Sequence, residues 1–179
     1  MSHESERWII PHMPADEQLL AAVGRVSLRH GYLDLMLKRI VMQLAGLSLS
    51  EAESALQFES SSALRDLARK LSGRRFGRAA VATLKIKALL ADCELATEQR
   101  NRLIHRDWAL DTMFNQVMLM SFYRQEHWPV PDAHELNGLA DSIYALARQC
   151  EDALGEGGFL HAAIAEVSTK ESIRALKNE

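Results

Sequence analysis

Residues 19–46 read LLAAVGRVSLRHGYLDLMLKRIVMQLAG, and this stretch sets the architecture that we expect for the whole chain. Eight of its residues repeat at alternating spacings of four and three, and we call them the seam: Leu19, Val23, Val26, His30, Leu33, Leu37, Ile40 and Leu44. That spacing predicts one helix of about thirty residues whose apolar stripe suits the core of a helical bundle. Gly46 ends the helix, because glycine readily adopts the left-handed backbone conformation found after many helices.

Two shorter helices are expected next. Ser48 and Glu51 stand at capping-box spacing and predict a short helix to about Gln57. Serines at 60–62 begin a third helix, which we expect to end at Gly73. Its apolar positions form a buried stripe, Leu64, Leu67, Ala68 and Leu71. Its basic side chains are expected to point outward, Arg65, Arg69 and Lys70.

A long helix is expected from about Arg78 to His105. Its apolar residues repeat at helical spacing and predict one buried face, formed by Val81, Leu84, Ala88, Ala91 and Leu95. Three neighbouring residues extend this face, Leu89, Leu90 and Ala96.

The helical pattern is lost after Trp108. Residues 116–124, QVMLMSFYR, are rich in β-branched and aromatic residues, and they favour a short β-hairpin over about 108–124. A helix through 113–122 is the competing interpretation, since methionine and leucine favour helices. Asp132 and Glu135 then cap a further helix that ends at the glycines of 155–158.

These patterns together predict an all-α fold, an antiparallel bundle of about five to six helices with at most one short hairpin. The length of 179 residues suits a single domain. We expect its core over about 15–155 and a C-terminal helical tail over 159–179.

Composition narrows the class of protein. With 47% hydrophobic and 25% charged residues, the chain resembles a soluble protein that can bury a core. Its apolar runs fall far short of the roughly 20 residues of a membrane span, and no secretion signal is present, so we expect a cytoplasmic protein without a membrane partner. Cys93 and Cys150 fit two small buried side chains in a reducing compartment. No histidines share metal-ligand spacing, and we expect neither metal nor cofactor.

Charge is unevenly distributed along the chain. The net charge is −3, but residues 65–87 contain eight basic residues and one acidic residue, a net of +7, so the remainder carries −10. Such asymmetry indicates an anionic partner. A solvated face of two helices explains the same charges equally well.

The stretch TEQRNRLIHRDW, residues 97–108, gathers polar groups at the expected end of the long helix. Asn101 and His105 are four residues apart and share a helical face. Arg100 lies about 140° around the axis from His105, within reach of a long side chain. Arginine binds phosphate, histidine transfers protons near neutrality, and asparagine orients the imidazole. These groups suffice for RNA cleavage without a metal.

A solvated helix end is the alternative for this stretch. Glu98 and Arg102 form an i, i+4 pair, and His105 and Arg106 suit the negative end of a helix dipole. This interpretation accounts for the charges. It gives no reason for Asn101, a poor helix former inside the last turns.

The sequence RNRLIH, from Arg100 to His105, resembles the R-x4–6-H motif of the HEPN superfamily, in its common form with asparagine directly after arginine. The resemblance covers about residues 15–155 and implies a metal-independent endoribonuclease with its active cleft across a homodimer. Arg100 and His105 would be the catalytic pair, supported by Asn101. We assign RNA binding to the neighbouring and upstream arginines, Arg102, Arg106, Arg74, Arg75 and Arg78.

The resemblance also implies partners. HEPN toxins pair with antitoxins, so a cognate antitoxin is an expected partner besides RNA and a second copy of the chain. Those paired with nucleotidyltransferases often carry tyrosine two residues past the histidine, where this chain has Asp107, so regulation by modification at that position is not expected. Some HEPN-like domains act only as binding modules. The alternative function is therefore a non-enzymatic helical module that binds RNA or a protein partner.

Overall fold

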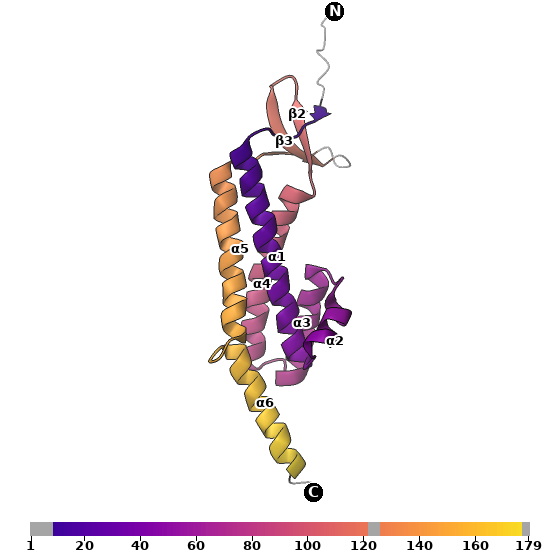
Figure 1. Ribbon diagram of the computed structural model, residues 1–179, viewed down its shortest axis with the longest axis vertical. Coiled ribbons are helices and arrows are strands. Elements are labelled where there is room, and N and C mark those ends of the chain that lie inside the picture. Colours follow the sequence, from indigo (N-terminus) through magenta and orange to yellow (C-terminus); the bar gives the residue numbers. More distant parts are fainter. Residues whose placement is uncertain (1–8, 122–125, 177–179) are drawn as a thin grey trace, which may run out of the picture.

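The computed structural model describes residues 9–121 and 126–176 as a helical bundle with a small sheet at one end (Figure 1). The chain order is β1 (Ile9–Pro11), α1 (Glu17–Ala45), α2 (Leu49–Leu56), α3 (Ser61–Phe76), α4 (Val81–Ile104), β2 (Asp107–Asp111), β3 (Gln116–Ser121), β4 (Glu126–Pro129), α5 (Ala133–Leu154) and α6 (Phe159–Leu176). The fold is thus mainly helical, as the sequence predicts.

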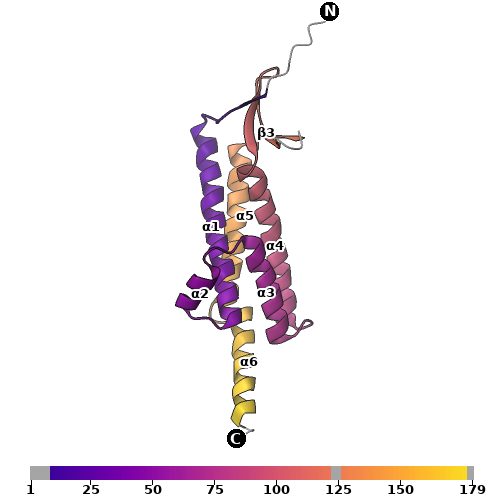
Figure 2. The same cartoon turned by 90° about the vertical axis from the view of Figure 1, so that its right-hand side faces the viewer.

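Helix α1 forms the centre of the bundle. Asp16 caps its start by accepting the backbone N–H of Gln18 at 2.8 Å, and Gly46 ends it at a φ of 70°. The predicted seam is confirmed, because its eight residues are buried or pack against the core. Helices α3, α4 and α5 surround α1, and α5 runs beside it for most of its length (Figures 1 and 2).

Helices α2 and α3 begin where their serine caps predict. Ser48 and Glu51 form both hydrogen bonds of a capping box, and Ser60 caps α3. Helix α3 continues past Gly73 to Phe76, because the left-handed residue is Gly77, with a φ of 95°. The prediction that Arg65 points outward is wrong, since this side chain is buried against α4.

Helix α4 buries a different face from the predicted one. Val81, Leu84 and Leu95 are 68%, 54% and 59% exposed, whereas Ile86 and Leu90 enter the core. Leu89, Leu90 and Ala96 are buried as expected. The first half of α4 carries apolar residues around most of its circumference, so spacing alone did not identify the face that meets α1. Five residues therefore form an exposed apolar stripe, which we name the α4 face: Val81, Leu84, Ala88, Ala91 and Leu95.

The expected hairpin is present, and its two strands belong to a larger antiparallel sheet of order β1-β2-β3-β4. Strands β2 and β3 pair from Asp107↔Met120 to Asp111↔Gln116, which confirms the hairpin over the helical alternative. The expectation of at most one hairpin is wrong, because β1 and β4 flank it. Both edge strands end in proline, which an edge strand tolerates but which weakens a strand signal in the sequence. Residues 122–124 of the predicted hairpin lie outside the described residues.

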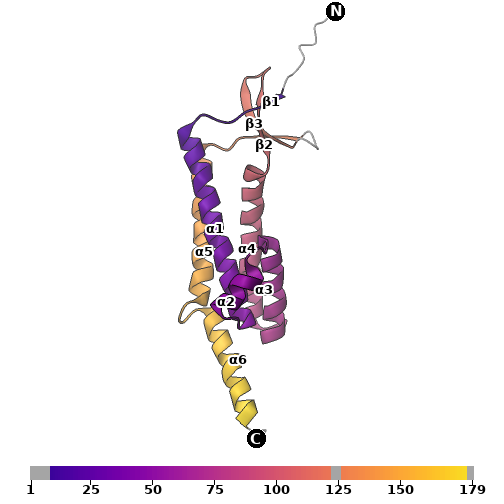
Figure 3. The same ribbon diagram turned by 45° about the vertical axis from the view of Figure 1, so that its right-hand side comes forward.

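Helices α5 and α6 complete the chain. Asp132 and Glu135 form the predicted capping box at the start of α5. Cys150 on α5 and Cys93 on α4 are free thiols, and both are buried as expected. Helix α6 confirms the helical tail and extends beyond the bundle at the end opposite the sheet (Figure 3). Residues 177–179 lie outside the description. Among the described helices, none is long and apolar enough to cross a membrane.

Candidate functional site

The Arg100–His105 motif forms the last turns of α4, where the helix meets the sheet. Arg100 is half-buried, and Asn101 and His105 are exposed. His105 is the C-cap residue, with a φ of −103°, and its backbone N–H still bonds the Asn101 carbonyl at 3.0 Å. The helix therefore stays regular through the motif and releases the chain directly after the histidine. The motif is held by a rigid element with its polar side chains open to solvent.

The three predicted catalytic side chains converge. Arg100 Nη1 lies 3.0 Å from Asn101 Oδ1 and 3.0 Å from His105 Nε2. A guanidinium has only donors, so His105 Nε2 accepts in this contact and carries no proton. The imidazole thus presents its basic nitrogen next to a permanent cation. This arrangement suits a proton acceptor beside an anion-binding group.

Arg100 also connects the motif to the interior. Burial tends to raise the pKa of the Asp34 carboxyl, but hydrogen bonds from His30 and Ser61 and the charges of His30 and Arg100 lower it below its ordinary value. Arg100 Nε is buried and has no hydrogen-bond partner within the described part of the chain. The charge of Arg100 thus acts on the Asp34 carboxyl, while its Nη1 contacts Asn101 and His105.

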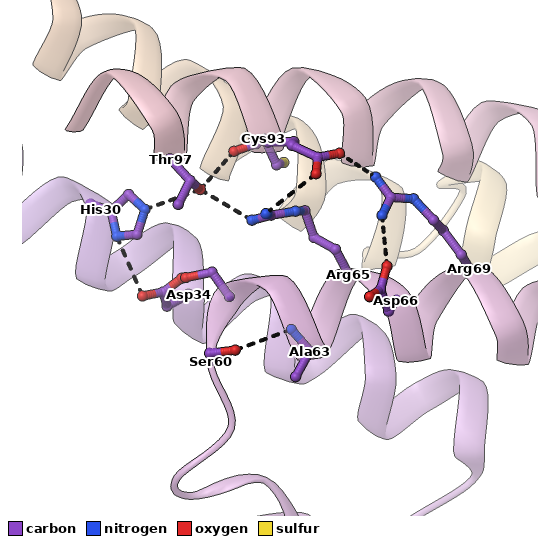
Figure 4. Close-up of polar contacts among 11 residues, drawn as sticks. His30, Asp34, Ser60, Ala63, Arg65, Asp66, Arg69, Cys93 and Thr97 are labelled. Carbon is purple, nitrogen blue, oxygen red and sulfur yellow. Dashed lines mark hydrogen bonds and ion pairs between the residues drawn. The ribbon is translucent and has the colours of Figure 1, made fainter. Parts of the chain in front are cut away.

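A buried polar network lies behind the motif, between α1, α3 and α4 (Figure 4). Thr97 Oγ1 donates to the Cys93 carbonyl at 2.7 Å. The same oxygen contacts Arg65 Nη1 and His30 Nε2, each at 3.2 Å. Because the hydroxyl proton is already used, both nitrogens must donate to Thr97.

The orientation of His30 follows from the same network. Its Nε2 donates to Thr97, and its Nδ1 lies 3.3 Å from the Asp34 carboxylate oxygen. His30 is 4% exposed and joins α1 to α4 through these contacts, so its role is structural. His30, one of the eight residues of the predicted seam, is thus buried in the core.

Part of the positive charge of segment 65–87 is paired within the fold, through Arg65 and Arg69. Arg69 binds Glu94 at 2.7 Å and Asp66 at 3.0 Å, and Arg65 lies 3.8 Å from Glu94. Burial tends to lower the pKa of Arg69, but the two carboxylates raise it above its ordinary value. The net charge of this segment therefore overstates its positive surface.

The predicted RNA-binding arginines fall into two separate groups. Arg74, Arg75 and Arg78 lie where α3 passes into α4, at the end opposite the motif. Helix α4 has 24 residues, which span about 36 Å at 1.5 Å per residue. Arg75 donates to the last carbonyls of α1, Gln43 at 3.1 Å and Leu44 at 3.0 Å, so it has a structural role. Arg74 and Arg78 are exposed.

Arg102 and Arg106 lie beside the motif and line a cavity of about 710 Å³. The cavity opens between the end of α4, strands β3 and β4, and the first half of α5. The Arg106 guanidinium carbon lies 3.0 Å from the ring centroid of Trp128, a cation–π contact. Trp128 is not among the residues predicted for the site, and its only signal in the sequence is an aromatic residue directly before the proline-rich stretch PVPD, residues 129–132.

The α4 face leads toward the motif. Its residues alternate at spacings of three and four, and Glu98 and Arg102 continue the same spacing beyond Leu95. These positions fall on one side of the helix, away from the stripe that meets α1. An exposed apolar stripe of this length on a helix is typical of a surface that meets another helix.

No protein-family model matches this sequence, and the comparisons with curated proteins and with solved structures give no match. Within residues 9–121 and 126–176, no group of three or more His, Cys, Asp and Glu side chains could hold a metal ion.

Proposed function

We propose that this protein is a metal-independent endoribonuclease of HEPN type, with Arg100, Asn101 and His105 as its catalytic residues. The observation that carries the proposal is the pair of 3.0 Å contacts from Arg100 Nη1 to Asn101 and His105. They place a cation, an amide and a basic imidazole nitrogen at one exposed point. RNA supplies the complementary groups, a phosphate for the cation and a 2′-hydroxyl for the base.

The reaction uses only proton transfer and charge stabilisation. His105 Nε2 takes the proton of the ribose 2′-hydroxyl, and the 2′-oxygen attacks the adjacent phosphorus. Arg100 turns from His105 to the phosphate and stabilises the charge of the phosphorane. The bond from phosphorus to the 5′-oxygen breaks, and an acid protonates that oxygen. The products are a 2′,3′-cyclic phosphate and a free 5′-hydroxyl.

The acid in this scheme comes from a second copy of the chain. The motif contains one histidine per chain, whereas base and acid are most simply supplied by two. We propose a homodimer that pairs through the α4 face, with the two helices crossing near Leu95. The exposed apolar stripe that ends close to the motif supports this pairing. A crossing at that end brings the two motifs together.

The test uses purified protein, single-stranded RNA and EDTA. We expect cleavage in the presence of the chelator, with a 2′,3′-cyclic phosphate on the 5′ product. A 2′-deoxynucleotide at the cut position removes the nucleophile and should abolish cleavage there. His105→Ala should lose activity, while His161→Ala, on exposed α6, serves as the matched control. Arg100→Lys should retain only part of the cleavage activity, because lysine keeps the positive charge but lacks the forked guanidinium.

The alternative function has a distinct outcome. A folded wild-type dimer that cuts a mixed RNA pool no better than His105→Ala would contradict the enzyme. If that protein still bound RNA, the chain would be a non-enzymatic helical binding module.

A further inference from the structure

The cavity beside the motif combines an aromatic stack with charged groups of both signs. Arg106 lies over Trp128 on one wall, and Arg102, Gln99 and Glu135 provide polar groups around the cavity. Leu119 and Leu136, both nearly fully buried, form part of its apolar floor. The volume of about 710 Å³ lies in the range of small-molecule sites. This combination of a flat stack, an apolar floor and a few polar groups suits a planar polar ligand.

The walls are fixed by the fold. In the sheet, Trp128 pairs with Leu119, which itself pairs with Trp108, so these three side chains share the face that packs on the bundle. Glu135 Oε2 accepts the Asp132 backbone N–H at 2.9 Å in the α5 capping box. The carboxylate is therefore held at the rim by the helix start and does not need a ligand to order it. A preformed wall of this kind favours selective binding.

The cavity adjoins the motif through α4. Arg102 and His105 are three residues apart on the same helix, so their side chains are neighbours on its surface. A nucleotide bound in the cavity therefore lies next to the position of the scissile phosphate. The cavity has two positive side chains, Arg102 and Arg106, and one negative side chain, Glu135. Its net positive charge favours an anionic ligand such as a nucleic acid strand over a cation.

The chemistry of the walls distinguishes between bases. Unpaired bases bind proteins by stacking on aromatic rings or guanidinium planes and by hydrogen bonds at their edges. Arg102 is a forked donor, which matches the O6 and N7 acceptors of guanine. Glu135 is an acceptor, which matches the guanine N1–H and N2–H donors. Among the four bases, only guanine presents two adjacent acceptors beside two adjacent donors.

We propose that this cavity binds an unpaired guanine of the RNA next to the scissile phosphate, with the base stacked on the Arg106–Trp128 pair and read by Arg102 and Glu135. The proposal rests on the proposed ribonuclease function, because that function identifies RNA as the molecule that carries the guanine. It adds a specificity site to that function and makes the enzyme guanine-selective.

The experiment separates binding from cleavage. It measures the anisotropy of labelled uridine-rich oligonucleotides that carry one central deoxyguanosine, deoxyadenosine, deoxycytidine or deoxyuridine, using His105→Ala protein. Cleavage is prevented twice, because the central nucleotide lacks the 2′-hydroxyl and the variant lacks the His105 imidazole that would take its proton. We expect the deoxyguanosine oligonucleotide to bind about 5- to 150-fold more tightly than the others, the range given by one well-formed base contact. Free guanosine monophosphate should compete only weakly, because it lacks the neighbouring phosphates.

Two variants assign the preference to the cavity. Glu135→Gln keeps a capping-box residue but removes the carboxylate, so it should fold normally and lose the guanine preference. Arg106→Ala should weaken binding of all four oligonucleotides by about tenfold, because it removes stacking that every base uses. Glu156→Gln, an exposed glutamate in the turn after α5, is the matched control and should behave like the parent.

Equal affinity for the four oligonucleotides would overturn the proposal. So would tight binding of guanosine monophosphate without binding of the oligonucleotide, which would identify a free nucleotide as the ligand. Guanine-selective binding in a wild type that does not cleave RNA would instead support this site and contradict the proposed ribonuclease. The two proposals therefore fail in different measurements.

Discussion

Helix α4 contributes to two clusters that contain the same residue types in opposite environments. In the buried cluster, His30 and Arg65 both donate to the Thr97 hydroxyl, and His30 also faces the Asp34 carboxylate. In the exposed cluster, Arg100 donates to Asn101 and His105 at the end of the same helix. One histidine acts only as a donor, whereas the other keeps a basic nitrogen next to solvent. An arginine and a histidine thus become structural or chemical according to the partners that the fold gives them.

The largest expected effect separates the two clusters by activity. His105→Ala should reduce RNA cleavage by about 10²- to 10⁴-fold, the usual loss for a general acid–base group. His105 is exposed and contacts one side chain, so the free energy of unfolding should change by less than about 0.5 kcal/mol. Single-turnover cleavage rates and urea unfolding measure the two quantities. A large loss of stability in this variant would contradict the assignment of a chemical rather than a structural role to the exposed cluster.

Thr97→Val tests the buried cluster in the opposite sense. Valine keeps the shape of threonine but leaves donors of Arg65 and His30 without an acceptor. We expect a loss of about 2–4 kcal/mol in the free energy of unfolding, since an unsatisfied buried donor costs about 1–3 kcal/mol and a charged one more. Thr97→Ser retains the hydroxyl and should lose much less. Equal stability of the two variants would show that the hydroxyl does not hold the network together.

The α4 face extends the comparison from one chain to a pair of chains. Leu95→Glu should raise the dissociation constant of the dimer by about 100-fold, because a charge replaces an apolar contact at the centre of the proposed crossing. Val81→Glu, about four helical turns from Leu95, should weaken the dimer less. Sedimentation measures both.

The opposite ranking of these variants would indicate a different dimer. An antiparallel pair centred between Ala88 and Ala91 would place Arg100 about 16 Å and His105 about 23 Å along the helix from the two-fold axis, at 1.5 Å per residue. Such a pair would separate the motifs and exclude the shared acid–base site, even if the protein were dimeric.

Arg75 and Arg74 are neighbours in the sequence with different expected effects. Arg75→Ala removes hydrogen bonds to the last carbonyls of α1 and should cost about 1–2 kcal/mol of stability. Arg74→Ala should leave stability unchanged and weaken RNA binding, with a smaller dependence of affinity on salt. Thermal unfolding and binding at two salt concentrations distinguish them. If both variants lowered only RNA affinity, the structural role of Arg75 would be wrong.

The fold was predictable where one apolar stripe stood against a polar background. The seam of α1 and the caps of α2 and α5 have this property, and the structure confirms them. Helix α4 lacks it, because apolar residues at Leu84 and at Ile86 compete and only the packing of α1 decides between them. The edge strands could not be predicted, since three or four residues with a proline acquire strand geometry only from a neighbouring strand.

The candidate site was predictable to the extent that it is local. Arg100, Asn101 and His105 lie within two helical turns, so helical geometry places them together. The network of Thr97 and the cavity of Trp128 join residues from distant parts of the sequence, and no spacing reveals them. Arg65 illustrates the limit, because its charge predicted a surface position and only a partner 32 residues away explains its burial.

The smallest expected effect tests the link between the two clusters, because Asp34 faces both His30 and Arg100. Its folded-state pKa is lower than the ordinary value, so its ionisation stabilises the folded protein above the unfolded pKa of about 4. This contribution is lost as the pH falls through the lower folded-state pKa. Since Asp34 remains partly open to solvent, the effect should be below about 1 kcal/mol. The stability difference between the wild type and Asp34→Asn should therefore stay constant between about pH 5 and 7 and shrink below about pH 4. Urea unfolding across that range measures it. A difference that grew on acidification would mean that the carboxylate, despite its two cationic neighbours, destabilises the fold.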